Sequence, residues 1–146
     1  MTKQFSNISV VGLGYVGLPL SLQFARSGVS VLGFDLDQQK VDSINASMTY
    51  LKHFSSESIA EQVKANRLEA TNEPSRLSEV EAILICVPTP LDDHREPDLS
   101  FVLDTARTIA PHLAKEALVT LESTTYPGTT EDELRIVLEE GSGMKA

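Results

Sequence analysis

The sequence predicts a doubly wound α/β domain, with a mostly parallel sheet and helices on both faces. The alternation of two kinds of segment predicts this class. Short apolar runs alternate with segments whose apolar residues recur at helical spacing, and such alternation is typical of strand–helix–strand units with right-handed crossovers. The length of 146 residues suits one domain with a core of its own.

Five stretches are expected to form strands. The clearest is AILICV (82–87), which is continuous and apolar, with charge before it and proline after it. Such runs suit a parallel sheet that is covered on both faces. The other expected strands are ISVVG (8–12), SVLGFD (30–35), LEAT (68–71) and ALVTLE (117–122).

Helices are expected between these strands. The first covers about 15–27 and ends at Gly28. Asp37 can cap a second, short helix that has Val41 and Ile44 on one face. After a polar stretch at 45–56, a third helix is expected around Ile59 and Val63.

Two further helices are expected in the second half of the chain. Apolar residues between Leu99 and Leu113 follow helical spacing after Asp98, which we expect to be the cap. Thr130-x-x-Glu133 is a capping box that would open a last helix. That helix would contain Leu134, Val137 and Leu138.

Composition restricts the class of protein. No apolar run is long enough to cross a bilayer, the N-terminus lacks a signal-peptide cleavage site, and one cysteine cannot form an internal disulfide. These features favour a cytoplasmic protein that contacts no membrane. The formal charge of −9 disfavours nucleic acid as a partner. No metal site is expected, because His53, His94 and His112 lie far apart in the sequence.

A glycine-rich motif stands between the first expected strand and helix. Gly12-Leu-Gly14-Tyr-Val-Gly17 matches G-x-G-x-x-G, the fingerprint of a Rossmann dinucleotide-binding turn. Gly12 permits the tight turn, Gly14 lets a pyrophosphate approach the backbone, and Gly17 lets the helix pack close to the sheet. Amides at the helix start, with the helix dipole, can then hold phosphate without any lysine.

A carboxylate at the end of the second strand completes this pattern. Asp35 can accept hydrogen bonds from the adenosine ribose hydroxyls, and its charge would repel a 2′-phosphate. This favours NAD over NADP, although Lys40 is a cation that could help to hold a phosphate. The alternative is a sharp turn followed by a surface aspartate that caps the next helix.

Two more strand ends have unusual residues. ICVPTPL (85–91) places Thr89 between two prolines, and LESTTYPGTT (121–130) presents Glu122, Ser123, Thr124 and Thr125 before a Pro-Gly pair. Each stretch alone suits ordinary turn and capping chemistry. Together with the glycine loop, they outline one crevice beyond the carboxyl ends of the strands. Cys86 lies within an apolar strand, so we interpret it as a small buried hydrophobe rather than a nucleophile.

VVGLGYVGLPLS, ILICVPTPL and LESTTYPGTT together resemble the N-terminal domain of the UDP-glucose/GDP-mannose dehydrogenase family, in register from Ile8 to the end of the chain. Members of that family use two NAD to oxidise the C6 hydroxyl of a nucleotide sugar to a carboxylate. LKHFSSESIAEQV and HREPDLSFV look most like the branch acting on UDP-N-acetylhexosamines, the UDP-N-acetylglucosamine 6-dehydrogenases in particular. The resemblance implies that residues 1–146 are the NAD-binding Rossmann domain of such an enzyme, in polysaccharide precursor synthesis.

The resemblance also implies roles for particular residues. It places Asp35 and Lys40 near the adenosine ribose, and Thr124 near the nicotinamide or a catalytic water. The dinucleotide cleft would be lined by Val87, Thr89 and Pro90. The residues placed on the cofactor pyrophosphate are Gly12, Gly14, Tyr15, Val16 and Gly17.

In that family the nucleophilic cysteine, its lysine partner and the sugar-binding residues lie downstream, in a connecting helix and a C-terminal domain. The 146 residues contain none of these and end at EEGSGMKA, where a further strand is expected. We therefore interpret the chain as a truncated cofactor domain, inactive alone, whose parent binds a UDP-sugar through the C-terminal domain and forms a homodimer.

Three alternatives stay open at this point. The parent could be a UDP-glucose or UDP-N-acetylmannosamine dehydrogenase. A β-hydroxyacid dehydrogenase also begins with a G-L-G loop, but Tyr15 and the VPTP turn disfavour it. The chain could also be a stand-alone dinucleotide-binding sensor that has no catalytic activity.

Overall fold

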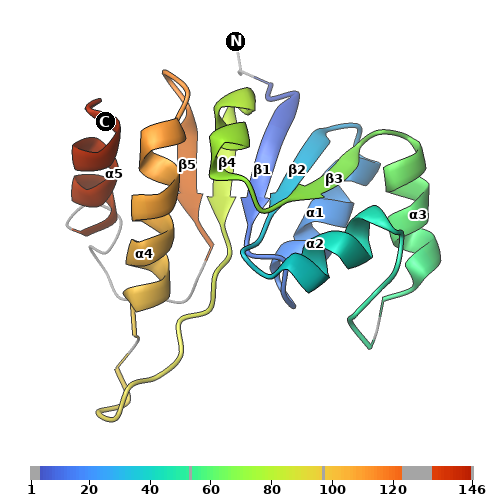
Figure 1. Cartoon of the computed structure of the whole chain (residues 1–146), viewed down its shortest axis with the longest axis horizontal. Helices are drawn as coiled ribbons and strands as arrows, with labels where there is room; N and C mark the ends of the chain where they lie inside the picture. The colour runs from blue at the N-terminus through green and yellow to red at the C-terminus, as the bar shows by residue number, and fades with distance from the viewer. Residues whose placement is uncertain (1–3, 53, 97, 123–132, 146) are drawn as a thin grey trace.

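The computed structural model describes residues 4–52, 54–96, 98–122 and 133–145. Its centre is a five-stranded sheet with the order β3-β2-β1-β4-β5, in which every neighbouring pair is parallel (Figure 1). The sheet confirms the expected α/β class. Its strands lie within or close to the five expected ranges: β1 Asn7–Val11, β2 Ser30–Phe34, β3 Leu68–Thr71, β4 Ala82–Ile85 and β5 Leu118–Leu121.

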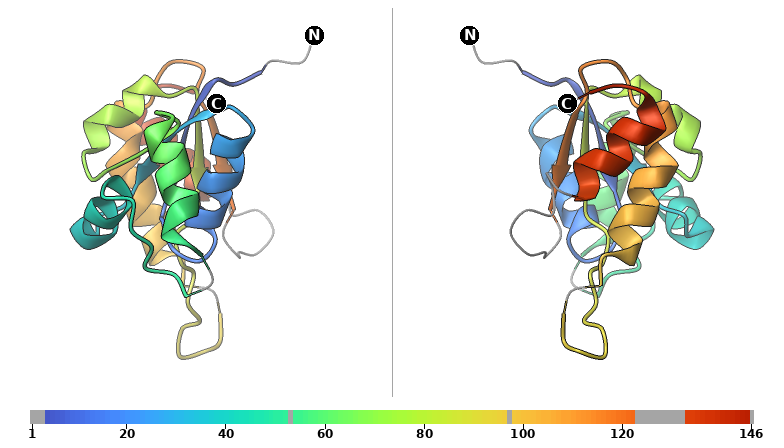
Figure 2. Two further views of the ribbon diagram at one scale, coloured as in Figure 1. Left: turned by 90° about the vertical axis from the view of Figure 1, so that its right-hand side faces the viewer. Right: turned by 90° about the vertical axis from the view of Figure 1, so that its left-hand side faces the viewer.

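Helices cover both faces of this sheet, as expected. Figure 2 shows α1 on one face and η1 and α4 on the other. The short 3-10 helix η1, between β3 and β4, was not expected from the sequence. The helical elements are α1 Gly17–Arg26, α2 Gln38–Asn45, α3 Ser56–Lys64, η1 Pro74–Glu79, α4 Ser100–Ile109, η2 Ala110–His112 and α5 Arg135–Ser142.

Local capping explains where several helices begin. The Asp37 carboxylate accepts from the Gln39 amide at 3.0 Å, which confirms the expected cap of α2. The Asp98 carboxylate accepts from the Ser100 amide at 2.9 Å, but α4 begins at Ser100, so Leu99 is its formal N-cap. Helix α1 begins at Gly17 rather than near residue 15, because residues 14–16 form a turn. Thr130 of the expected capping box lies outside the described residues.

The alternation of side chains along the strands produces two cores. Ile8 and Val10 of β1 belong to the first core, which lies under α1 and α3. Val11 belongs to the second core, which lies under η1 and α4. β4 divides in the same way, with Ala82 on the first side and Ile83 on the second. Because successive strand residues face opposite ways, apolar runs are needed where both faces are covered.

The outer edge of β3 is closed by a side chain. Asn45, the last residue of α2, donates to the Ala70 carbonyl and accepts from the Ala70 amide, both at 2.9 Å. Its carboxamide thus takes the place of a neighbouring strand at this position. The contact ties α2 to the sheet beside the second βα turn.

Replacing Asn45 with alanine should lower the free energy of unfolding by about 1–3 kcal/mol, because it leaves a half-buried N–H and C=O without their partner. Urea denaturation measures the change. Gln39→Ala, at an exposed position of the same helix, is the control and should change stability by less than about 0.5 kcal/mol. Equal stability of the Asn45 variant and the wild type would contradict this role.

Candidate functional site

The carboxyl ends of β1, β2 and β4 meet at one edge of the sheet, the lower edge in Figure 1. β1 pairs with β2 on one side and with β4 on the other. The strand order therefore reverses next to β1, and open α/β sheets bind ligands outside such a switch point. The structure brings the glycine loop, Asp35 and the segment after β4 together at this edge, as the sequence predicted.

Two glycines of the loop are required by close backbone contacts. Gly12 has φ +95°, and a Cβ at that position would lie 2.8 Å from the Cys86 carbonyl oxygen. A Cβ on Gly17 would lie 1.6 Å from the Gly12 carbonyl oxygen. The chain can therefore leave β1 and enter α1 at this distance only because both residues lack side chains.

Gly14 is different, because its surroundings are open. A Cβ built on Gly14 meets no atom within 4 Å. Among the described residues, the amides of residues 14–17 have no hydrogen-bond acceptor, whereas the Leu18 amide donates to the Gly14 carbonyl at 3.1 Å. Open space and free amides at the positive end of a helix dipole suit a pyrophosphate group.

Asp35 is bonded directly to the glycine loop. One carboxylate oxygen accepts from the Leu13 amide and the other from the Asp37 amide, each at 2.9 Å. A carboxylate oxygen has more than one acceptor position, so both can also accept from ribose hydroxyls. The side chain is 15% exposed and faces Lys40, whose Nζ lies 3.9 Å from Oδ2. Lys40 therefore forms an ion pair with the Asp35 carboxylate, next to the place where the adenosine ribose is expected.

Tyr50 is a member of the site that the sequence analysis missed. Its hydroxyl donates to the Leu13 carbonyl, and its ring centroid lies 6.0 Å from Lys40 Nζ. Burial raises the pKa of the Tyr50 hydroxyl well above its usual range, and the charges of Asp35 and Asp37 raise it further. The hydroxyl thus stays protonated, and able to donate, at neutral pH.

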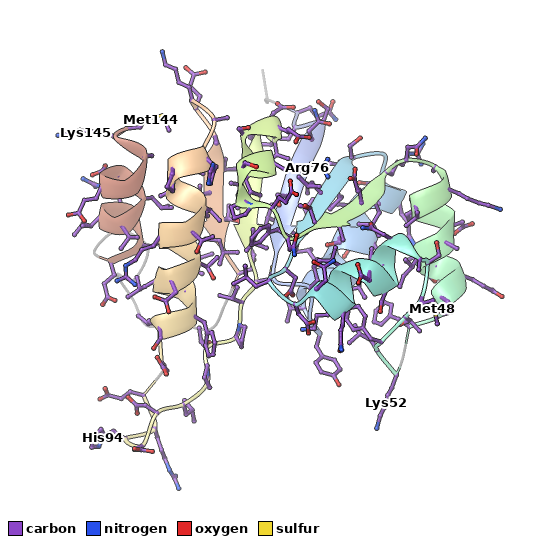
Figure 3. All side chains as sticks on the ribbon, in the orientation of Figure 1. Met48, Lys52, Arg76, His94, Met144 and Lys145 are labelled. Carbon is purple, nitrogen blue, oxygen red and sulfur yellow. The ribbon has the colours of Figure 1, made fainter. Side chains whose placement is uncertain are left out.

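One signal for this segment was available in the sequence. Apolar and aromatic side chains interrupt the polar stretch at 45–56, and Leu51 is buried. The neighbouring Met48 is 60% exposed, and Figure 3 shows Lys52 pointing outward from the same segment. Leu51 packs into the first core, which holds Tyr50 against the glycine loop.

A hollow of about 380 Å³ lies between the glycine loop and the start of α2. The loop supplies one wall, and α2 and the segment that follows it supply the other. Two charged and two aromatic side chains contribute to the lining, and one of the charged side chains, Lys40, also faces Asp35. The lining residues are Gly14, Tyr15, Asp37, Gln39, Lys40, Ser43, Tyr50 and Leu51.

The segment after β4 lies next to the glycine loop, because a Cβ on Gly12 would meet backbone atoms of Cys86 and Val87. Val87 packs against the second core, Thr89 is half-buried and Pro90 is exposed. The Pro90 carbonyl accepts from the Asp98 amide at 2.7 Å, which closes the loop between them. Figure 3 shows His94 at the far tip of this loop, away from the sheet. Thr124 lies outside the described residues, so its expected role is untested.

Cys86 has the environment of a structural thiol. It is half-buried against the first core, and its amide donates to the Val11 carbonyl at 2.7 Å, in continuation of the β1–β4 ladder. Burial, and then the charge of Glu122, raise the pKa of the thiol to about 11. The thiolate is the nucleophilic form, and it is disfavoured at neutral pH.

The described part of the chain contains neither a metal-binding cluster nor a membrane-spanning helix. Its histidine, cysteine, aspartate and glutamate side chains form no group of three or more that could hold a metal ion. None of its helices combines the length and the apolar character needed to span a membrane.

Comparison with known proteins gives a consistent result. The UDP-glucose/GDP-mannose dehydrogenase family, NAD binding domain, matches residues 6–146. UDP-N-acetyl-D-mannosamine dehydrogenase of Escherichia coli (strain K12) is 43% identical over 128 residues, which are 87% of this chain and 30% of that protein. UDP-N-acetyl-D-glucosamine 6-dehydrogenase of Pseudomonas aeruginosa is 36% identical over 138 residues, 94% of this chain and 32% of that protein.

Solved structures show the same relationship. NDP-N-acetyl-D-galactosaminuronic acid dehydrogenase from Methanosarcina mazei Go1 superposes with a TM-score of 0.88 at 37% identity, over 97% of this chain and 32% of that one. The chain thus spans about a third of the length of these relatives. With a family match over nearly the whole sequence and the expected dinucleotide fold, the chain belongs to the UDP-glucose/GDP-mannose dehydrogenase family, as its NAD-binding domain.

Proposed function

We propose that this chain is the NAD-binding part of a nucleotide-sugar 6-dehydrogenase that oxidises the C6 hydroxyl of a UDP-N-acetylhexosamine to a carboxylate, in polysaccharide precursor synthesis. Relatives named for N-acetylmannosamine and N-acetylglucosamine substrates support this sugar class. The observation that supports the cofactor role most directly is the 2.9 Å bond from the Leu13 amide to Asp35, which joins the ribose-binding carboxylate to the phosphate-binding loop.

The described residues fit NAD at three places. The amides of residues 14–17 would hold the pyrophosphate, and Asp35 with Lys40 would bind the adenosine ribose. Val87, Thr89 and Pro90 would line the dinucleotide beyond β4. When bound, NAD supplies the hydride acceptor for alcohol oxidation; the chain binds and orients it. Thr124 stays the candidate residue near the nicotinamide.

The remaining functions would belong to the rest of the parent protein. The UDP-sugar would bind to a further domain, and a covalent intermediate would need a nucleophilic thiol other than Cys86, because that thiol stays protonated at neutral pH. We also propose that the parent is a cytoplasmic homodimer. A UDP-glucose dehydrogenase is the alternative enzyme, since such an enzyme from Pyrobaculum islandicum superposes at a TM-score of 0.89 and 28% identity. A stand-alone NAD sensor is the alternative from a different class.

The chain should bind NAD about tenfold or more tightly than NADP, because the Asp35 charge repels a 2′-phosphate. Calorimetric titration with both cofactors measures this. Asp35→Asn keeps an oxygen that can accept from the Leu13 amide but removes the charge. It should therefore reduce the difference between the two affinities, mainly by improving NADP binding. Asp35→Ala should also reduce this difference, but it should weaken NAD binding as well. Equal affinity of the wild type for both cofactors would refute the assignment.

Replacing Gly14 with alanine should weaken NAD binding, whereas replacing Gly17 with alanine should destabilise the fold. Gly14→Ala adds a methyl group into open space, so the unfolding midpoint should stay within about 2 °C while NAD affinity falls about tenfold or more. Gly17→Ala should destabilise the fold by several kcal/mol, because its Cβ would overlap the Gly12 carbonyl. Thermal unfolding and NAD titration of both variants distinguish these outcomes. A folded Gly14→Ala variant with full NAD affinity would disprove the pyrophosphate position.

The chain alone should not oxidise UDP-N-acetylglucosamine, UDP-N-acetylmannosamine or UDP-glucose. Conversion of an alcohol to a carboxylate takes two hydride transfers with the aldehyde held between them, and Cys86 is a poor nucleophile in its strand. NADH formation followed by absorbance, with wild type and Cys86→Ser, is the assay. Turnover that disappears in the serine variant would overturn the structural role of Cys86.

A further inference from the structure

Two side chains from distant parts of the sequence hold the backbone of Leu13. The Asp35 carboxylate accepts from its N–H, and the Tyr50 hydroxyl donates to its C=O. The Leu13 side chain is fully buried in the first core. The middle of the G-x-G turn is therefore held at three points.

The bond from Tyr50 has a geometric consequence for Gly14. The Leu13 carbonyl and the Gly14 N–H belong to one peptide unit, which is planar and trans, so the two groups point in opposite directions. A donor that fixes the carbonyl on the Tyr50 side therefore directs the Gly14 N–H to the other side. The Gly14 amide is among those without an acceptor in the described part of the chain, and a hydrogen bond to the carbonyl also polarises it as a donor.

We propose that Tyr50 is a positioning residue of the cofactor site, which orients the Gly14 amide toward the pyrophosphate of NAD. This inference rests on the NAD-binding function proposed above. Tyr50 acts through the Leu13–Gly14 peptide rather than by touching the reacting atoms. It also forms part of the wall of the hollow beside the ribose site, with Lys40 next to its ring.

The location of Tyr50 suits this role. Leu51, the next residue, is 6% exposed and anchors the segment in the core. The hydroxyl of Thr49, by contrast, bonds within its own segment, to the Leu51 carbonyl at 3.2 Å and from the Leu51 amide at 3.1 Å. Thr49 thus offers a hydroxyl in the same segment that has no bond to the glycine loop.

The test compares Tyr50→Phe with Thr49→Val. Tyr50→Phe keeps the ring and loses the donor, so NAD affinity measured by calorimetry should fall about five- to tenfold. In the protein without cofactor, the NMR resonance of the Gly14 amide should shift, because the peptide it belongs to loses the donor to its carbonyl. Thr49→Val should keep the wild-type affinity and the wild-type Gly14 resonance.

Three outcomes would overturn the inference. The first is wild-type NAD affinity and an unchanged Gly14 resonance in Tyr50→Phe; the second is an equal loss of affinity in Thr49→Val, which would assign the effect to the segment as a whole. The third needs no substitution: the Gly14 amide resonance of the wild type should move on NAD titration, and a binding isotherm without that movement excludes the proposed contact. Failure of the wild type to bind NAD would instead refute the proposed function.

Discussion

The path from β1 into α1 is limited by two backbone contacts, and the shape of the site follows from them. β1 is flanked on both sides, so the chain that leaves it must pass close to Cys86 after β4 and then turn back over its own Gly12. A side chain at Gly12 or Gly17 would overlap a carbonyl. This steric limit brings the start of α1 to the sheet edge, where the amides of residues 14–17 have no acceptor among the described residues and the space around Gly14 is open.

The charge distribution suits a site where backbone dipoles, rather than cationic side chains, would bind a phosphate group. The chain has a formal charge of −9, and the hollow beside the loop is lined by Asp37 with Lys40 as its cation. Lys40 already faces Asp35. Negative charge on a ligand would therefore be held mainly by amides and by the dipole of α1, which carry no net charge. The same acidic surroundings disfavour the 2′-phosphate that NADP carries on its adenosine ribose.

The proposed division between cofactor binding and sugar chemistry agrees with the placement of the single cysteine. Cys86 continues a central strand, where its amide takes part in the ladder and its thiol packs against the core. A residue so placed can support the glycine loop, since its carbonyl lies against Gly12. It cannot at the same time be the exposed, low-pKa thiol that covalent catalysis needs.

Local sequence signals were sufficient to predict most of the fold. Apolar runs predicted the three central strands β1, β2 and β4, because a strand buried on both faces needs apolar residues throughout. The edge strands β3 and β5 were also predicted, although they are less apolar or less buried. Asp37 and Asp98 were predicted as caps, since a cap bonds an amide only two or three residues away. The 3-10 helix η1 was missed because six residues are too few for a recognisable helical repeat.

By itself, then, the sequence determined the order of elements, the positions of the loop glycines and the carboxylate after the second strand. The tertiary structure alone decided that Tyr50 donates to Leu13, 37 residues away in sequence, and that Asn45 closes the edge of β3, 25 residues away. The physical reason is that hydrogen bonds between distant segments depend on how the whole chain packs. No periodicity within either segment encodes the identity of its partner.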